Sequence, residues 1–208
     1  VDMQSSVDHA PPLLLPYRAA GFVSDGLPLA LTVHGEVTFI TASIGSCFQV
    51  YSSEKLQTAF VSAPLPSRVT ALCTHQGELT LVACGADVFV YRRAEQVAQC
   101  AGQHEAAVTQ LLTFGNVLVS ICGRGLVVAW ELPSGKPLAQ LHTGFVPTAA
   151  LHPATYLNKV LLGAADGRLQ LWNLRSRARV YEFGGWGAAV GCLEQSPALD
   201  VVAIGLAN

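Results

Sequence analysis

Residues 152–173 have the sequence HPATYLNKVLLGAADGRLQLWN, which predicts a β-hairpin. Within it, Val160 to Leu162 form a short apolar run, and the pair Asp166-Gly167 supplies two residues that tolerate the positive φ of a tight turn. The return strand follows this turn and ends on an aromatic residue, Trp172. Because the hairpin recurs along the chain, it decides the predicted fold.

Aromatic residues end four such return strands at intervals of 40, 39 and 42 residues, namely Tyr51, Tyr91, Trp130 and Trp172. A period of about 40 to 45 residues with four strands per repeat is typical of WD-repeat propeller blades. Helical repeats would place apolar residues every three to four positions, whereas here β-branched and aromatic residues come in short runs separated by Gly, Pro, Ser and Asp. The sequence therefore predicts an all-β, WD40-type β-propeller.

We expect an N-terminal arm at residues 1–16 and the first part of a propeller at residues 17–208. The first strand of the first blade is expected near Ala20 to Ser24. About four complete blades and part of a fifth are predicted, at residues 17–62, 63–101, 102–142, 143–184 and 185–208. Since propellers protect their sheet edges by closing a ring of typically four to eight blades, we expect the ring to be incomplete here and the chain to be the first part of a larger propeller.

The composition limits the classes of function. Charged residues make up 12% of the 208 residues, about half of the usual share, while 51% are hydrophobic. A chain so poor in charge either buries much of its surface or gives much of it to a partner. The net charge of −2 argues against a generally basic nucleic-acid-binding protein, although it leaves room for a local basic patch. No apolar run approaches the length of a membrane span, and we expect no secretory signal, because residues 1–4 do not form a cationic region followed by a hydrophobic one.

The six cysteines include no Cys-x-x-Cys pair, and four of them fall inside predicted strands. This spacing favours small buried hydrophobic residues over zinc ligands or disulfides. We therefore expect a reducing compartment, the cytosol or the nucleus.

Signals of enzymatic chemistry are weak. The sequence has neither a Gly-x-Ser-x-Gly elbow nor a Gly-x-x-x-x-Gly-Lys loop, and its histidines lack metal-ligand spacing. Residues 185–191 imitate a dinucleotide fingerprint, but the third glycine comes one place late and a strand, not a helix, is expected to follow. We predict no enzyme, no catalytic residue, no cofactor and no metal.

WD repeats stabilise a blade with a buried hydrogen-bonded tetrad of His, Ser or Thr, Asp and Trp. The third predicted blade contains His104, Ser120 and Trp130, but Arg124 stands in the place of the Asp. The fourth has the turn Asp166-Gly167 and Trp172, but no His in its entry loop. We interpret these residues as structural, with a catalytic role for His104 or Asp166 as the alternative.

Five of the twelve basic residues lie in 21 positions of the fourth blade, with Asp166 as the single acid among them: Lys159, Arg168, Arg175, Arg177 and Arg179. This pattern is typical of a solvated hairpin, and the alternative is a contact with RNA phosphates. Trp186 is a further candidate contact because glycines flank it. A large aromatic on such a turn is either tucked between blades or offered to a partner, and we expect it to be tucked.

Several stretches resemble one known family: 152–159 with 169–173, 181–187 (YEFGGWG), 196–203 (SPALDVVA) and, less specifically, 18–21, 46–51 and 92–97. The family is the tandem WD-repeat, U3 small nucleolar RNA-associated subunit of the UTP-B complex, and the resemblance is to its N-terminal propeller. It covers nearly the whole chain.

The resemblance implies a non-enzymatic, nucleolar scaffold of the small-subunit processome that supports early pre-18S rRNA processing. It also implies contacts with other UTP-B and processome proteins and candidate contacts with pre-rRNA or U3 RNA, but no membrane and no small-molecule substrate. The alternative from the residues alone is a general WD-repeat adaptor that binds a peptide or protein in a cytosolic or nuclear complex.

Overall fold

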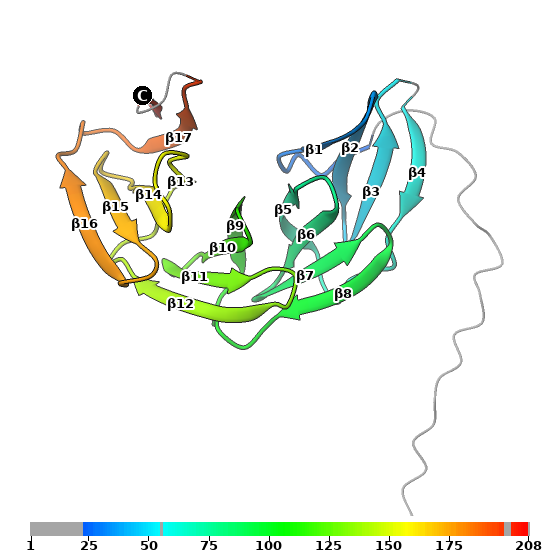
Figure 1. Ribbon diagram of the computed structural model, residues 1–208, viewed down its shortest axis with the longest axis horizontal. Coiled ribbons are helices and arrows are strands. Elements are labelled where there is room, and N and C mark those ends of the chain that lie inside the picture. Colours follow the sequence, from blue (N-terminus) through cyan, green and yellow to red (C-terminus); the bar gives the residue numbers. More distant parts are fainter. Residues whose placement is uncertain (1–22, 55, 198–200, 208) are drawn as a thin grey trace, which may run out of the picture.

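The computed structural model of the chain describes residues 23–54, 56–197 and 201–207. This part of the chain contains eighteen strands, which form four four-stranded antiparallel sheets and one two-stranded sheet. Figure 1 shows the sheets arranged around an open centre, as an arc whose two ends do not meet. The predicted all-β propeller, with four complete blades and part of a fifth, is confirmed. The described residues include no helix that is long and apolar enough to span a membrane.

Within each blade the strands follow one another in chain order, the first nearest the open centre and the fourth at the outer rim (Figure 1). The strands are, in blade one, β1 (Ala30–His34), β2 (Val37–Ile44), β3 (Cys47–Ser52) and β4 (Gln57–Val61); in blade two, β5 (Val69–His75), β6 (Leu79–Cys84), β7 (Asp87–Arg92) and β8 (Glu95–Cys100); in blade three, β9 (Val108–Phe114), β10 (Val117–Cys122), β11 (Leu126–Glu131) and β12 (Lys136–His142); in blade four, β13 (Ala149–Leu151), β14 (Lys159–Gly163), β15 (Leu169–Asn173) and β16 (Ala178–Phe183); and in blade five, β17 (Val190–Gln195) and β18 (Val202–Leu206).

The first strand of blade one lies later in the chain than the sequence predicted. Residues 20–22 lie outside the described part of the chain, and Val23 and Ser24 are not in a strand. The innermost strand is β1, because Gly35 adopts a φ of 60° and forms a two-residue turn with Glu36. This turn pairs His34 with Val37 and makes the segment directly before it the partner of β2.

The antiparallel order gives every blade two sets of connections. The turns from first to second strand and from third to fourth strand lie on one side, which we call the hairpin face. The turns from second to third strand and the loops between blades lie on the other side, which we call the crossover face. Any loop can therefore be assigned to a face from the strand order alone.

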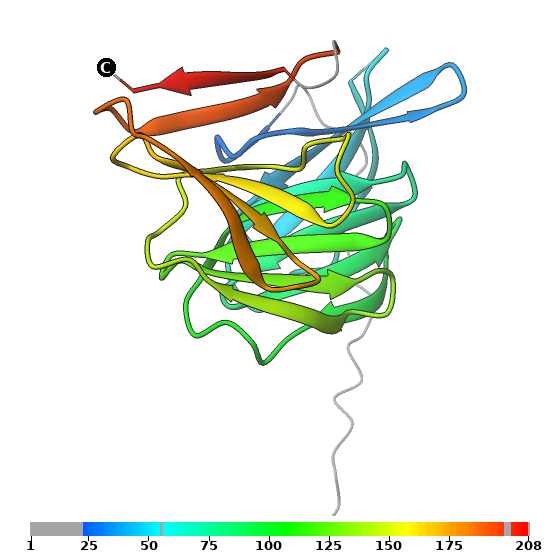
Figure 2. The same cartoon turned by 60° about the vertical axis from the view of Figure 1, so that its left-hand side comes forward.

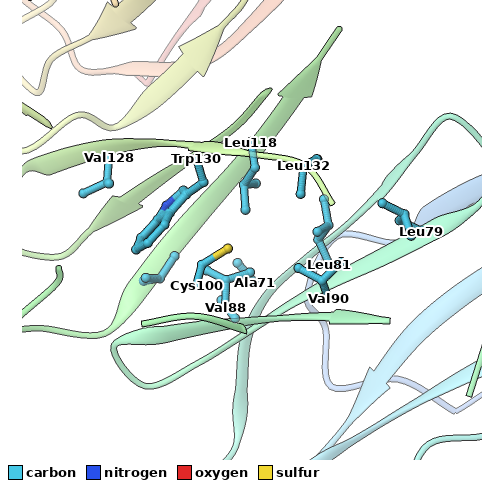
Figure 3. Packing of buried hydrophobic residues seen from close by; sticks show 12 residues of the cluster. Ala71, Leu79, Leu81, Val88, Val90, Cys100, Leu118, Val128, Trp130 and Leu132 are labelled. Atoms are coloured by element: carbon cyan, nitrogen blue, oxygen red, sulfur yellow. The ribbon is translucent and has the colours of Figure 1, made fainter. Parts of the chain in front are cut away.

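The core lies between blades rather than within them. Successive sheets pack face to face (Figure 2), and alternate residues of one strand serve the two neighbouring interfaces. On β10, Leu118 packs in the cluster shared with blade two, which Figure 3 shows around Trp130, while Val119 packs in the cluster shared with blade four. Both side chains are fully buried.

All six cysteines are free and lie in strands. Three are buried (Cys84, Cys100 and Cys122), and Cys47 and Cys73 are half-buried. Desolvation of the sulfur by the surrounding protein raises the pKa of the Cys73 and Cys100 thiols to about 12. Cys192 is exposed, so the expectation that the cysteines are buried is wrong for this residue. It lies on β17, whose only described partner strand is β18.

Candidate functional site

In blade three the structure joins three of the singled-out residues by hydrogen bonds. His104 lies in the loop between β8 and β9, Ser120 on β10 and Trp130 on β11. The indole Nε1–H of Trp130 donates to Ser120 Oγ at 2.7 Å, and His104 Nε2 lies 2.6 Å from the same oxygen. Since the serine is fully buried, the network ties the loop between two blades to the two central strands of blade three.

The His104 ring is held in its neutral form. Burial lowers its pKa to about 4, and the negative charge of Asp87 opposes this shift only in part. If Nε2 carries the proton, it donates to Ser120 Oγ, and the serine hydroxyl is free to donate to the Val128 carbonyl at 3.4 Å. This tautomer leaves Nδ1 as a buried acceptor without a partner among the described residues.

The fourth member of the usual tetrad is replaced by an outward-facing residue. The guanidinium of Arg124 donates to Glu105 at 3.3 Å, and both side chains are largely exposed. Arg124 therefore makes no contact with the network, which agrees with the unpartnered Nδ1 of His104.

Blade four replaces the tetrad with a chain of hydrogen bonds along β15 and β16. Trp172 Nε1–H donates to Gln170 Oε1 at 2.8 Å, and Gln170 Nε2–H donates to Glu182 at 2.6 Å. Glu182 in turn accepts from Arg179 and forms an ion pair with Arg168 at 3.7 Å. The sequence reasoning missed both Gln170, which is buried, and Glu182.

A signal for the glutamine was present in the sequence. Gln49 precedes Tyr51 by two residues, as Gln170 precedes Trp172, so each pair lies on the same side of its strand. In blade one, the Tyr51 hydroxyl donates to Gln49 in the same way.

Asp166 and Trp172 are not in contact. Asp166 Oδ2 accepts from Arg168 Nε at 2.7 Å, while the backbone N–H of Arg168 donates to Oδ1 at 3.1 Å. This backbone bond, together with the guanidinium of Arg168, holds the pKa of Asp166 below its ordinary value. Gly167 completes the turn with a φ of 85°.

The basic residues of blade four do not form one patch. Arg168 and Arg179 are in ion pairs with Asp166 and Glu182. The other three form no ion pair with a described residue and belong to the hairpin face: Lys159, Arg175 and Arg177. Lys159 Nζ lies 4.0 Å from the centre of the Tyr156 ring, a cation–π contact.

Trp186 is exposed by 51%, so the expectation that it is tucked between blades is wrong. The reason is a close backbone contact beneath it. A Cβ on Gly167 would lie 2.7 Å from the Trp186 nitrogen, and a Cβ on Gly185 would lie 2.7 Å from the Asp166 oxygen. The glycine-rich loop therefore lies directly on the β14–β15 turn, which leaves no space there for the indole.

Within the described ranges, no group of three or more His, Cys, Asp or Glu residues could hold a metal ion.

Four-stranded blades in an arc, with the aromatic residues Tyr51, Trp130 and Trp172 on three of the third strands hydrogen-bonded inside their blades, define a WD-repeat β-propeller. A family model described as the WDR36/Utp21 first β-propeller matches residues 40–208. The chain belongs to this family.

Curated relatives agree with this assignment. The U3 small nucleolar RNA-associated protein 21 homolog of Schizosaccharomyces pombe is 38% identical over 198 residues, which cover 91% of this chain and 22% of the relative. The WD repeat-containing protein 36 of Homo sapiens is 34% identical over 195 residues, with the same two coverages. The U3 small nucleolar RNA-associated protein 21 of Saccharomyces cerevisiae is 27% identical over 201 residues, covering 91% of this chain and 21% of the relative. The chain thus spans about a fifth of the length of the curated relatives it matches.

Solved structures show the same fold at low sequence identity. A chain of the mitotic checkpoint complex matches with a TM-score of 0.74 and 17% identity, covering 99% of this chain and 68% of that one. The computationally designed Ika8 protein matches with a TM-score of 0.69 and 22% identity, covering 85% of this chain and 54% of the designed one.

Proposed function

We propose that this chain belongs to a nucleolar, U3 small nucleolar RNA-associated protein that acts as a non-enzymatic scaffold of the small-subunit processome and supports early pre-18S rRNA processing. The observation that carries the proposal is the 38% and 34% identity, over 91% of the chain, to relatives whose family the chain shares. The name of the Schizosaccharomyces pombe relative states the association with U3 RNA.

The state of the candidate catalytic residues supports a scaffold. His104 is buried, is held neutral and is bonded to Ser120, so it is not available to a substrate. Asp166 is paired with Arg168 on an exposed turn. Both side chains stabilise local structure and leave the loops of the two faces as the surfaces offered to partners.

Affinity purification of the full-length protein from growing cells tests this function, with mass spectrometry of the proteins and sequencing of the bound RNA. We expect UTP-B subunits together with U3 RNA and pre-18S rRNA. Recovery of an unrelated complex without these RNAs would favour the general WD-repeat adaptor.

A direct RNA contact is a second proposal, for which the hairpin face of blade four is the candidate. Its support is the three cations outside ion pairs, Lys159, Arg175 and Arg177, and the partly exposed Tyr156, on which a base can stack. We expect Arg175→Glu to lower the yield of RNA crosslinked to the full-length protein. Arg124→Glu on the crossover face is the matched control, and equal yields from the two variants would refute the contact.

A further inference from the structure

A groove of about 860 Å³ opens on the hairpin face between blades one and two. Val37, Phe39 and Phe60 of blade one form its apolar wall, and Leu79 lies on the side of blade two. Arg92 and Arg93 also line it, at the end of β7 and in the turn that follows. Neither the family match nor the assignment to the processome gives this groove a role.

The equivalent gaps between blades two and three and between blades three and four are each closed by a leucine. Leu132 and Leu174 each begin a four-residue loop after the third strand, between Glu131 and Lys136 and between Asn173 and Ala178. The backbone N–H of Leu132 donates to the Asn116 carbonyl at 2.9 Å, and that of Leu174 donates to the Asn158 carbonyl at 2.8 Å. Their side chains are only 4% and 6% exposed.

Each leucine faces the preceding blade. Leu132 packs in the cluster formed with Leu79 and Leu81 of blade two (Figure 3), and Leu174 packs in the cluster between blades three and four. Beside Leu132 a pocket of only about 100 Å³ remains, against about 860 Å³ between blades one and two. The leucine at this position therefore decides whether the gap is open.

Blade two cannot supply such a leucine because its last turn is too short. Arg92 pairs with Glu95, so the turn consists of Arg93 and Ala94 alone, two residues fewer than in blades three and four. Arg93 adopts a φ of 57° and is exposed. An arginine thus stands where the neighbouring blades place a buried apolar side chain, and no side chain of the described residues takes the place of that leucine against the wall of blade one.

The charge at this groove is unbalanced. The guanidinium groups of Arg92 and Arg93 make no hydrogen bond or ion pair with any described residue. Glu78 is the single acidic side chain among the lining residues. An occupant that complements this surface has an apolar side chain for the wall and carboxylates for the two arginines.

We propose that the groove binds an extended acidic segment of a partner protein, which inserts a leucine or phenylalanine against Phe39 and Phe60 and places aspartate or glutamate beside Arg92 and Arg93. The inserted side chain fills this gap, as Leu132 and Leu174 fill the two following gaps between blades. A peptide fits better than RNA because the wall is apolar, and phosphates would find only the two arginines at the rim. The site is independent of the processome assignment, so either proposal can fail alone.

The test selects peptides from a random phage-displayed library on the full-length protein and measures the binding of the selected peptides by fluorescence polarisation. We expect peptides with a Leu or Phe flanked by Asp or Glu. Arg92→Glu combined with Arg93→Glu should weaken their binding by about tenfold or more. Arg124→Glu combined with Arg68→Glu, on the crossover face, is the matched control and should leave binding unchanged.

A second variant tests the shape of the groove rather than its charge. Replacing Arg93-Ala94 with Leu-Pro-Ser-Gly, the sequence of residues 132–135, should close the groove and abolish binding. Selection of peptides without an acidic and apolar pattern, or equal binding to the charge-reversed protein, would overturn the proposal. So would charge-sensitive binding of a single-stranded RNA without peptide binding. Peptide binding that appears only after removal of residues 1–22 would identify the chain's own arm as the occupant instead.

Discussion

Replacing Ser120 with alanine should destabilise blade three by about 3 kcal/mol. The serine oxygen accepts from Trp130 at 2.7 Å and bonds His104 at 2.6 Å, in a site with no exposed surface. Without it, two buried polar groups lose their partner, at about 1–3 kcal/mol each. His104 Nδ1 has no partner among the described residues either, so both tautomers of the ring are left with a buried N–H without an acceptor. The expected loss of about 3 kcal/mol therefore lies within the sum of the two costs, about 2–6 kcal/mol.

Ser43 offers a matched control. Its side chain is also buried, with 2% exposure, but its Oγ has no partner among the described residues. Ser43→Ala removes the same atom without breaking a hydrogen bond, so it should be neutral or slightly stabilising.

Hydrogen exchange read by mass spectrometry in the full-length protein measures both variants locally. In Ser120→Ala, protection of β10 and β11 should fall by about a hundredfold, which corresponds to the expected change in the free energy of local opening. Ser43→Ala should leave the protection of β2 and β3 intact. Similar small effects of the two substitutions would refute the reasoning that the network stabilises the blade.

Three further predictions concern single residues. Burial lowers the pKa of His104 to about 4 from an ordinary 6.5, so the contribution of the neutral ring to stability is fully present above pH 6.5. Up to about 3 kcal/mol of the free energy of unfolding should be lost as the pH falls to 4. Denaturant titrations at several pH values should show a weaker pH dependence in His104→Gln. Gln170→Leu should destabilise β15 and β16 by about 1–3 kcal/mol, since the Trp172 indole N–H loses its acceptor; unchanged hydrogen exchange there would contradict this. Gly167→Ala should loosen residues 184–189 more than Gly187→Ala does. Both glycines have a left-handed φ, but only a Cβ at position 167 would meet backbone atoms, at 2.7 Å. Circular dichroism melts and hydrogen exchange of residues 184–189 measure the difference between the two variants.

The repeat could be read from sequence because its signals are local. A strand is marked by alternation and a turn by Gly or Asp, so the aromatic residues Tyr51, Tyr91, Trp130 and Trp172 set the blades correctly. The same logic failed at the first strand, where the Gly35-Glu36 turn was not recognised as the hairpin that defines β1.

Side-chain partners were harder to predict because they cross strands. Glu182 lies three residues beyond the basic stretch, yet β16 folds back so that Glu182 stands opposite Gln170 and within reach of two arginines. Counting charges over residues 159–179 therefore overstated the net positive charge of this blade, because Glu182 lies outside that range. The open groove had a sequence signal, since the connection after Tyr91 is shorter than that after Trp130, but its meaning depends on the packing of Leu132 against the preceding blade.

The proposed role in small-subunit rRNA processing is tested most directly by depleting the full-length protein from growing cells and measuring rRNA precursors by Northern blotting. The account predicts that pre-18S intermediates accumulate and mature 18S rRNA falls, while large-subunit rRNA is maintained and re-expression of the wild-type protein restores processing. Unchanged pre-18S intermediates after complete depletion would contradict it.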